Sequence, residues 1–236
     1  MAQPLLERLR HLASAAAGRR YVPPEELAYS RLKAKGIAPA YMIDVGAYQG
    51  EWTRLARRVF GDVPVLMVEA QSAKRSFLDK VCADLPNVRW EQTLLSRSSG
   101  QKVRFFEMET GSSMFPENSN VSRVEKELVT ATLDEIAGPV PAPTLLKIDV
   151  QGAEIEVLEG AERTLSTCEV VQLEVALLPY NAGAPTMTEV LNYMAEREFV
   201  PFDISGMSRP NGVDLAQIDL LFTRSSSMLR NRYFEF

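Results

Sequence analysis

Apolar and polar residues follow one another along the chain in blocks that predict strands and helices in turn. Four blocks are almost continuously apolar, as in strands covered on both faces of a sheet, and they lie at 41–45, 63–69, 144–148 and 170–175. Blocks with apolar residues at helical spacing separate or follow these strands, at 51–58, 72–83, 153–161 and 185–197. This alternation predicts an α/β domain with a mostly parallel sheet.

The other strand-like blocks complete the predicted sheet and add to it. We expect a third strand at 87–95 and a terminal hairpin-like pair at 199–204 and 217–223. Two shorter blocks, at 102–108 and 125–131, predict extra strands outside this series. The sum is a Rossmann-like, doubly wound sheet of seven mostly parallel strands, one of them antiparallel.

Residues 1–38 are predicted to form a helical extension of a domain that covers 39–236. Four leucines between residues 5 and 12 have helical spacing, and a Pro-Pro pair at 23–24 opens a second helix that ends near Lys35. We expect both helices to cap the domain. A dimerisation arm or a membrane-surface segment is the alternative, so a homodimer is considered.

Composition narrows the classes of protein that fit. The 236 residues suffice for one sizeable α/β domain, with 46% hydrophobic and 24% charged residues. A net charge of −5 argues against non-specific nucleic-acid binding. Cys82, Cys168 and His11 build neither a disulfide framework nor a zinc site, which favours a reduced, cytoplasmic setting. No apolar run approaches the ~18 residues of a membrane span, and no signal-peptide core is present.

The most informative stretch is the end of the strand at 41–45 and the turn that follows it. Gly46 and Gly50 lie four apart, directly before a helix, where glycine lets the backbone turn tightly and a ligand come close. The nicotinamide fingerprint G-x-G-x-x-G is incomplete because Tyr48 and Glu51 stand at its glycine positions. Asp44 precedes the turn and suits a ligand with a cationic amino-acid tail rather than a phosphate. An ordinary strand-to-helix turn is the alternative.

A second acid agrees with a nucleoside at this turn. Glu69 ends the next strand, 19 residues after Gly50, where an acid hydrogen-bonds ribose hydroxyls in nucleoside-binding α/β folds. The segment that ends at Leu95 and Ser96 is expected to lie on the adenine side. A solvated strand-end carboxylate is the alternative interpretation of Glu69.

These motifs together resemble the FkbM family of S-adenosylmethionine-dependent O-methyltransferases over about residues 41–223. The resemblance rests on Asp44-Val-Gly46-Ala47-x-x-Gly50, Glu69, Gly111-Ser-Ser-Met114, Thr132-Leu-Asp134 and Leu146-Lys-Ile-Asp-Val-Gln-Gly-Ala-Glu154. Tyr48 stands where members often have Asn, Gln151 where they often have Glu, and Ala70 where Pro is common. The resemblance implies the class I methyltransferase fold, with S-adenosylmethionine as the cofactor. The expected cofactor contacts are Asp44, Gly46, Ala47, Tyr48, Gly50, Thr53, Glu69, Ala70, Leu95 and Ser96.

The chemistry is expected at the carboxyl ends of the strands, where ligands sit in open sheets. Asp44, Glu69, Asp149 and Glu174 fall at or near those ends, so we expect four acids to line one crevice. Asp149 is the first candidate for the base that deprotonates a hydroxyl acceptor, and Glu174 is the second. Lys147 is expected to be the charge partner of Asp149 or a hydrogen-bond donor to the incoming oxygen of the acceptor. A purely structural Lys147–Asp149 pair is the alternative.

Three further residues are candidates for substrate contact: Ser113, Gln151 and Glu154. The N-terminal helices and the loops at 110–123 and 205–216 are expected to add others. A divalent cation on Asp149, Glu154 and Glu174 is a weaker alternative, so no metal is assigned.

The sequence therefore predicts an enzyme that methylates a hydroxyl of a sugar or a small secondary metabolite. Two other classes stay open. One is a nicotinamide-dependent oxidoreductase, and the other is a non-catalytic partner protein that keeps the fold and binds S-adenosylmethionine. A nucleic-acid methyltransferase is the weakest alternative, because of the charge balance.

Overall fold

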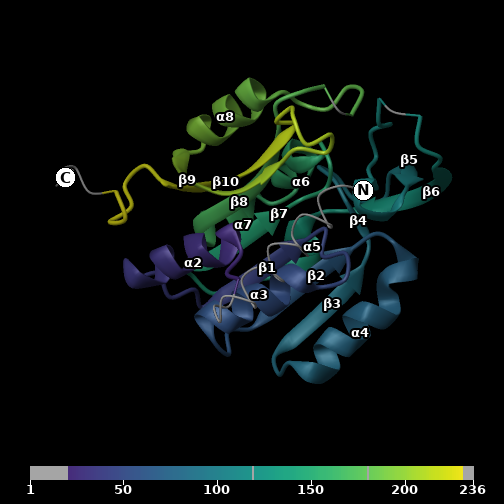
Figure 1. The fold of residues 1–236 in the computed structure, drawn as a ribbon. Helices are drawn as coiled ribbons and strands as arrows, with labels where there is room; N and C mark the ends of the chain where they lie inside the picture. Colours follow the sequence, from purple (N-terminus) through teal and green to yellow (C-terminus); the bar gives the residue numbers. More distant parts are fainter. Residues whose placement is uncertain (1–20, 119, 180, 231–236) are drawn as a thin grey trace.

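A seven-stranded sheet forms the centre of the computed structural model, which describes residues 21–118, 120–179 and 181–230. The strand order is β3-β2-β1-β7-β8-β10-β9 (Figure 1). The strands are β1 Tyr41–Val45, β2 Val65–Glu69, β3 Val88–Gln92, β7 Thr144–Ile148, β8 Cys168–Ala176, β9 Phe199–Ser208 and β10 Gln217–Arg224. β10 is antiparallel to both of its neighbours and the other pairs are parallel, so the predicted fold class is confirmed.

Helices cover both faces of this sheet, as strands that are apolar on both sides require. One core contains α5 Leu133–Ala137, α6 Glu154–Glu159, α7 Glu162–Thr167 and α8 Met187–Glu196. The other core contains α2 Pro24–Ala34, α3 Glu51–Phe60 and α4 Arg75–Asp84. The β1 side chains follow the period of two: Ile43 and Val45 enter the first core and Met42 the second. Asp44 therefore points into the same layer as Met42.

The helix α2 is packed into the second core rather than standing apart. Ala28, Tyr29 and Leu32 are completely buried, and Lys35 lies over the Phe202 ring of β9. Its bounds agree with the helix expected from Pro23 to Lys35. The helix expected between residues 5 and 12 lies outside the described residues.

A second, small sheet lies beside the main one, with the order β4-β6-β5. It consists of β4 Leu94–Leu95, β5 Lys102–Glu107 and β6 Val124–Ala131, and β5 and β6 stand at one side of the molecule (Figure 1). The single strand expected at 87–95 was wrong: it breaks at Thr93, because its last two residues pair with β6 instead of β2.

Two other boundaries differ from expectation. The helix expected at 153–161 ends at Glu159, and α7 starts after Gly160, where a Cβ would lie 2.3 Å from the Ser96 carbonyl oxygen. The loop expected at 205–216 is shorter, because β9 stays paired with β10 through Ser208. Within the described segments, no helix has the length and apolar character needed to span a membrane.

Candidate active site

A cavity of about 290 Å³ opens at the carboxyl ends of β1, β2 and β7. The turn after β1 and the strand end at Glu69 form one side, and the segment 109–114 beyond β5 lies across it. Glu25 from α2 and Asp219 from β10 reach the same cavity. This is the edge at which ligands bind in open α/β sheets.

The turn after β1 can be built only with glycine at its first position. Gly46 has φ +73°, and a Cβ there would lie 1.9 Å from the carbonyl oxygen of Asp149. The N–H groups of Gly46 and Ala47 donate to the Val68 carbonyl at 2.9 and 3.1 Å, which ties the turn to β2. Gly50, also left-handed, starts α3 behind the cavity wall. The turn is therefore held rigidly against both neighbouring strands.

Asp44 and Thr53 lie beneath this turn and not on the cavity wall. Both are completely buried, and the Thr53 hydroxyl donates to Asp44 Oδ2 at 2.7 Å. Asp44 Oδ1 lies 3.3 Å from Lys147 Nζ. The expectation that four acids line one crevice is therefore wrong for Asp44, which supports the wall from behind as a buried ion-pair partner.

Lys147 connects the buried acid to the acid in the cavity. Its Nζ lies 3.5 Å from Asp149 Oδ2 and donates to the Gly46 carbonyl at 3.0 Å. Burial alone would lower its pKa, but Asp149 and Asp44 outweigh burial and hold the pKa of Lys147 above its ordinary value. Since its protons are engaged by these acceptors, the structure favours the charge-partner role over donation to an incoming oxygen.

Glu69 lies at the cavity with both carboxylate oxygens fixed. The backbone N–H of Tyr48 donates to Oε2 and that of Gln71 donates to Oε1, each at 2.8 Å. Burial raises the pKa of Glu69, and the two N–H groups oppose that rise. A carboxylate oxygen is able to accept more than one hydrogen bond, and each Glu69 oxygen accepts one from the backbone. Glu69 can therefore also accept from hydroxyl groups of a ligand.

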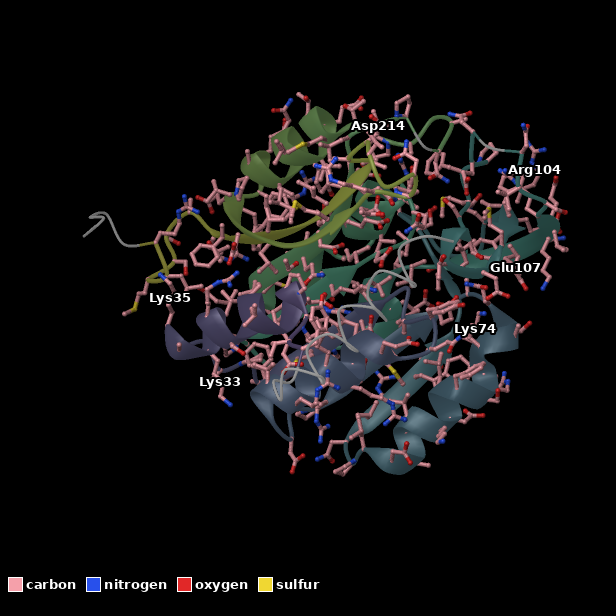
Figure 2. The ribbon with its side chains drawn as sticks, viewed as in Figure 1. Lys33, Lys35, Lys74, Arg104, Glu107 and Asp214 are labelled. Carbon is pink, nitrogen blue, oxygen red and sulfur yellow. The ribbon has the colours of Figure 1, made fainter. Side chains whose placement is uncertain are left out.

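Tyr48 joins the turn to the segment that crosses the cavity. Its backbone is left-handed, with φ 51°, and its hydroxyl donates to Glu109 Oε2 at 2.8 Å. Lys74 Nζ lies 2.7 Å from the same oxygen and 4.2 Å from the centre of the Tyr48 ring. Gln71 donates to the Glu109 carbonyl at 3.0 Å. Lys74 lies beneath the small sheet that carries Glu107 (Figure 2).

Asp149 and Glu174 are bridged by an amide. Gln151 Nε2 donates to Asp149 Oδ1 at 3.0 Å and also to Glu174 Oε2, and the Gln151 backbone is left-handed, with φ 56°. Asp149 and Gln151 line the cavity, whereas Glu174 stands behind them. Burial, and then the charge of Asp149, holds the pKa of Glu174 well above its ordinary value. Glu174 is therefore a poorer candidate for a base that touches substrate.

The remaining predicted residues divide between the cavity and its support. Ser113, buried on the wall, donates to the Gln151 carbonyl at 2.8 Å. Glu154 Oε1 accepts from the N–H groups of Val150 and Gly152, and burial raises its pKa to about 7. Ser96 faces α6, where it donates to Glu156 at 3.3 Å.

Most of the predicted residues thus meet at one place. Those on the cavity wall are Gly46, Ala47, Tyr48, Glu69, Ala70, Leu95, Ser113, Lys147, Asp149 and Gln151. Those behind it are Asp44, Gly50, Thr53, Ser96, Glu154 and Glu174. None of the described residues form a group of three or more His, Cys, Asp or Glu side chains able to hold a metal ion. The alternative metal set is therefore not assembled, and Glu154 faces backbone N–H groups instead.

The cavity residues that were missed from the sequence include Glu25, Trp52, Gln172 and Asp219. Gln172 carried a usable signal, because a polar residue in the middle of an apolar strand needs a buried partner. Glu25 carried none, since its role depends on how α2 packs.

The cavity changes chemically from one end to the other. Val68, Leu94, Leu95 and Phe105 give it an apolar wall, and Glu69 stands at the strand end between that wall and the glycine turn. Lys147 is the only cation that the structure places on the wall, against the carboxylates of Glu25, Asp149 and Asp219. These residues fit a ligand with an apolar base, a hydroxylated sugar and a positively charged tail.

Comparison with protein families agrees with this chemistry. The model of the methyltransferase FkbM domain matches residues 44–201, which include the glycine turn, Glu69 and the Lys147–Glu154 segment. No curated protein matches the chain.

Three methyltransferases are among the solved structures with a similar arrangement. They include magnesium protoporphyrin IX methyltransferase from Synechocystis PCC 6803 with bound SAM, at 11% identity and a TM-score of 0.48 over 85% of this chain and 77% of that one. The ribosomal protein L11 methylase of Lactobacillus delbrueckii subsp. bulgaricus has 13% identity and a TM-score of 0.46 over 85% and 77%. A SAM-dependent methyltransferase of Aquifex aeolicus has 12% identity and a TM-score of 0.41 over 85% of this chain and 89% of that one. These likenesses are remote, so the match to the family model carries the assignment.

Proposed function

The chain belongs to the FkbM methyltransferase family, and from this premise we propose that it methylates a hydroxyl group of a sugar or small secondary metabolite. Its cofactor is S-adenosylmethionine. When bound, this cofactor supplies an electrophilic methyl group on a positively charged sulfur. Membership of a methyltransferase family leaves no support for the nicotinamide oxidoreductase.

Glu69 and the glycine turn are proposed to hold the cofactor. The Glu69 carboxylate accepts hydrogen bonds from ribose hydroxyls, and Val68, Leu94 and Leu95 contact the base. Asp44, Thr53 and Lys147 keep the turn in shape from beneath. Methyl transfer gains most from alignment of the reacting groups, which supplies ~7–11 kcal/mol in well-oriented systems, and a rigid turn contributes to that alignment.

Asp149 is proposed as the base that accepts the proton of the hydroxyl. The observation that carries this role is the contrast between the two acids on Lys147. The Asp44 side chain is 0% exposed, whereas the Asp149 side chain is 34% exposed and lines the cavity. A purely structural ion pair would have no need of the second carboxylate. The single histidine, His11, lies outside the described residues.

The neighbours of Asp149 suit it to this task. Lys147 and the Gln151 amide each hold one of its oxygens, which fixes the carboxylate while leaving it able to accept a further hydrogen bond. Ser113 holds the Gln151 backbone. Ser113 and Gln151 are accordingly proposed to contact the acceptor.

The remaining proposals concern the domain bounds, the cellular location, the oligomeric state and the class of acceptor. Residues 39–236 are taken as the methyltransferase domain and residues 1–38 as its extension, in a cytoplasmic protein, with a homodimer as one option. The net charge of −5 favours a small-molecule acceptor over nucleic acid.

The test is a methyl-transfer assay with S-adenosylmethionine and a panel of glycosides and polyketides, read as a mass gain of one methyl group. We expect Asp149→Asn to lower kcat by about 10²–10⁴ on the acceptor found, with S-adenosylmethionine affinity changed less than about threefold. Asp203→Asn is the control, since this exposed acid pairs with Arg31 away from the cavity.

Two results would contradict the proposal. Equal kcat for Asp149→Asn and wild type would remove Asp149 as the base. Tight binding of S-adenosylmethionine without transfer to any acceptor would instead favour the non-catalytic partner protein.

A further inference from the structure

A chain of buried hydrogen bonds leads from Trp52 on α3 to the carboxylate of Glu25 on the cavity wall. Trp52 Nε1, on α3, donates to the Tyr29 hydroxyl at 2.6 Å. The Tyr29 hydroxyl donates to Gln172 Oε1, and Gln172 Nε2 donates to Glu25 Oε1 at 2.7 Å. Tyr29 is 0% exposed and Gln172 1% exposed, so water does not compete for these bonds.

The donor and acceptor of every hydrogen bond in this chain follow from Trp52, where it begins. The indole N–H of Trp52 can only donate, so the Tyr29 oxygen must accept. The one proton of the Tyr29 hydroxyl then goes to the amide oxygen of Gln172. The amide nitrogen of Gln172 is left to face Glu25, which therefore meets it as an acceptor.

This chain of hydrogen bonds holds one oxygen of Glu25, and Glu25 lines the cavity. Three other carboxylates of the wall have partners: Glu69 accepts two backbone N–H groups, Glu109 pairs with Lys74, and Asp149 pairs with Lys147. Among the described residues, the neutral amide of Gln172 is the hydrogen-bond partner of the Glu25 carboxylate, and no direct ion pair holds it. Burial raises the pKa of Glu25, while the Gln172 hydrogen bond and the more distant charge of Lys147 oppose that rise.

The negative charge of Glu25 acts electrostatically on a ligand bound in the same cavity. In a small cavity with protein walls, a carboxylate acts on a charge several ångströms away, because the effective dielectric constant is far below that of water. Asp219 lies on the same wall, and because burial raises its pKa to about 7, it adds a full negative charge only above that pH. Lys147 cannot offset the negative charge of the wall fully, since its ammonium group is already shared by Asp44 and Asp149.

We propose that Glu25 makes the site discriminate between the two states of its cofactor, binding S-adenosylmethionine more tightly than S-adenosylhomocysteine. The two ligands share their nucleoside and amino-acid tail and differ in one methyl group and in the positive charge on sulfur. A carboxylate without a cation favours the charged form and lets the neutral product leave. This inference rests on the proposed use of the cavity for S-adenosylmethionine.

The test measures the dissociation constants of both ligands by isothermal titration, without any acceptor. Glu25→Gln is nearly isosteric: its amide oxygen can still accept from Gln172, while the charge is removed. Glu26→Gln is the matched control, because Glu26 is the next residue of α2, pairs with Arg58 at 3.2 Å and is not on the cavity wall. Glu25→Asp keeps the charge and serves as the conservative variant.

We expect Glu25→Gln to lower the ratio Kd(S-adenosylhomocysteine)/Kd(S-adenosylmethionine) by about three- to tenfold, through weaker S-adenosylmethionine binding. Glu26→Gln and Glu25→Asp should leave the ratio within about twofold of wild type. An unchanged ratio for Glu25→Gln, or equal weakening of both ligands, would overturn the inference and leave the proposed function intact. A wild-type protein that binds neither ligand would overturn the proposed function itself.

Discussion

The two sides of the cavity are built in different ways. On the side of β1 and β2, backbone groups and one carboxylate that two backbone N–H groups hold, Glu69, form the wall, and left-handed residues at Gly46 and Tyr48 fix its shape. On the side of α2, β7 and β10, the wall is made of charged side chains, with Glu25, Asp149 and Asp219 around one lysine. The first side depends on shape and the second on charge.

This difference teaches which substitutions each side tolerates. A rigid backbone wall should fail abruptly when an atom is added, because its neighbours are backbone atoms that cannot move aside. A wall of side-chain charges should instead respond gradually to pH and to isosteric changes. Substitutions on the two sides test this contrast, and we take them from the largest expected effect to the smallest.

Gly46→Ala should have the largest effect, because the added Cβ would lie 1.9 Å from the Asp149 carbonyl oxygen at φ +73°. The left-handed conformation alone costs ~1–2 kcal/mol, and the clash adds to it. We expect S-adenosylmethionine affinity to fall by more than about 100-fold in isothermal titration, with a lower thermal midpoint.

Gly36→Ala is the control for backbone strain without a clash. Gly36 is also left-handed, with φ +96°, but nothing lies within 4 Å of its added Cβ. It should lower the thermal midpoint and leave cofactor affinity unchanged. Equal loss of affinity in both variants would show that strain, and not the contact with Asp149, matters.

The charged side should make stability depend on pH. Burial raises the pKa of Glu154 from 4.5, and that of Asp219 from 3.8, to about 7 in each case. Since the folded state holds these protons more tightly than the unfolded state, stability falls as pH rises from about 4 to about 7. In urea unfolding, Glu154→Gln should remove up to ~3 kcal/mol of this pH dependence.

Glu156→Gln, on the same helix, is the control of opposite sign. Its hydrogen bond with Arg97 lowers the pKa of Glu156, so its contribution is lost as pH falls instead. A wild-type protein whose unfolding free energy does not decline between about pH 4 and about pH 7 would refute this account of the buried acids.

Tyr48→Phe should have a moderate effect on the backbone side. It removes the bond to Glu109 and keeps the ring beneath Lys74. With segment 109–114 held less firmly, we expect the cofactor to dissociate about three- to tenfold faster in stopped-flow fluorescence, using Trp52 on the cavity wall as the reporter. Tyr41→Phe, at the start of β1, should not change the rate. Identical dissociation rates in wild type and Tyr48→Phe would rule out a role for this contact.

Ser96→Ala should have the smallest effect. The Ser96 hydroxyl donates to Glu156, which also accepts from Arg97, and Ser96 does not line the cavity. We expect S-adenosylmethionine affinity within about twofold of wild type. A tenfold loss would mean that the cofactor extends beyond the wall formed by Leu95.

The same contrast explains how far the sequence could predict the site. Gly46 and Glu69 act through a local turn and a strand end, and such patterns can be seen in the chain itself, as can the order of strands and helices. The side chains of Asp44 and Glu154 were expected at the ligand, but Asp44 turns to Lys147 on another strand and Glu154 turns back to the backbone N–H groups of its own motif. Sequence position alone does not give the direction of a side chain.

Long-range packing set what the sequence could not predict. Glu25 reaches the cavity only because Tyr29 and Trp52 pack edge to face in the core between α2 and α3, with ring centres 5.9 Å apart. The break at Thr93 depends on β6, which lies more than thirty residues later in the chain. Neither feature has a local pattern.

The central claim is that the cavity between the glycine turn and Glu69 holds S-adenosylmethionine. Its most direct test is isothermal titration of S-adenosylmethionine into wild type, Glu69→Gln and the exposed control Glu91→Gln. In Glu69→Gln, the amide NH₂ must face either the Tyr48 or the Gln71 N–H, which places two donors against each other. We predict one bound equivalent in wild type and Glu91→Gln, and affinity at least about tenfold lower in Glu69→Gln. Undiminished binding by Glu69→Gln would contradict the account.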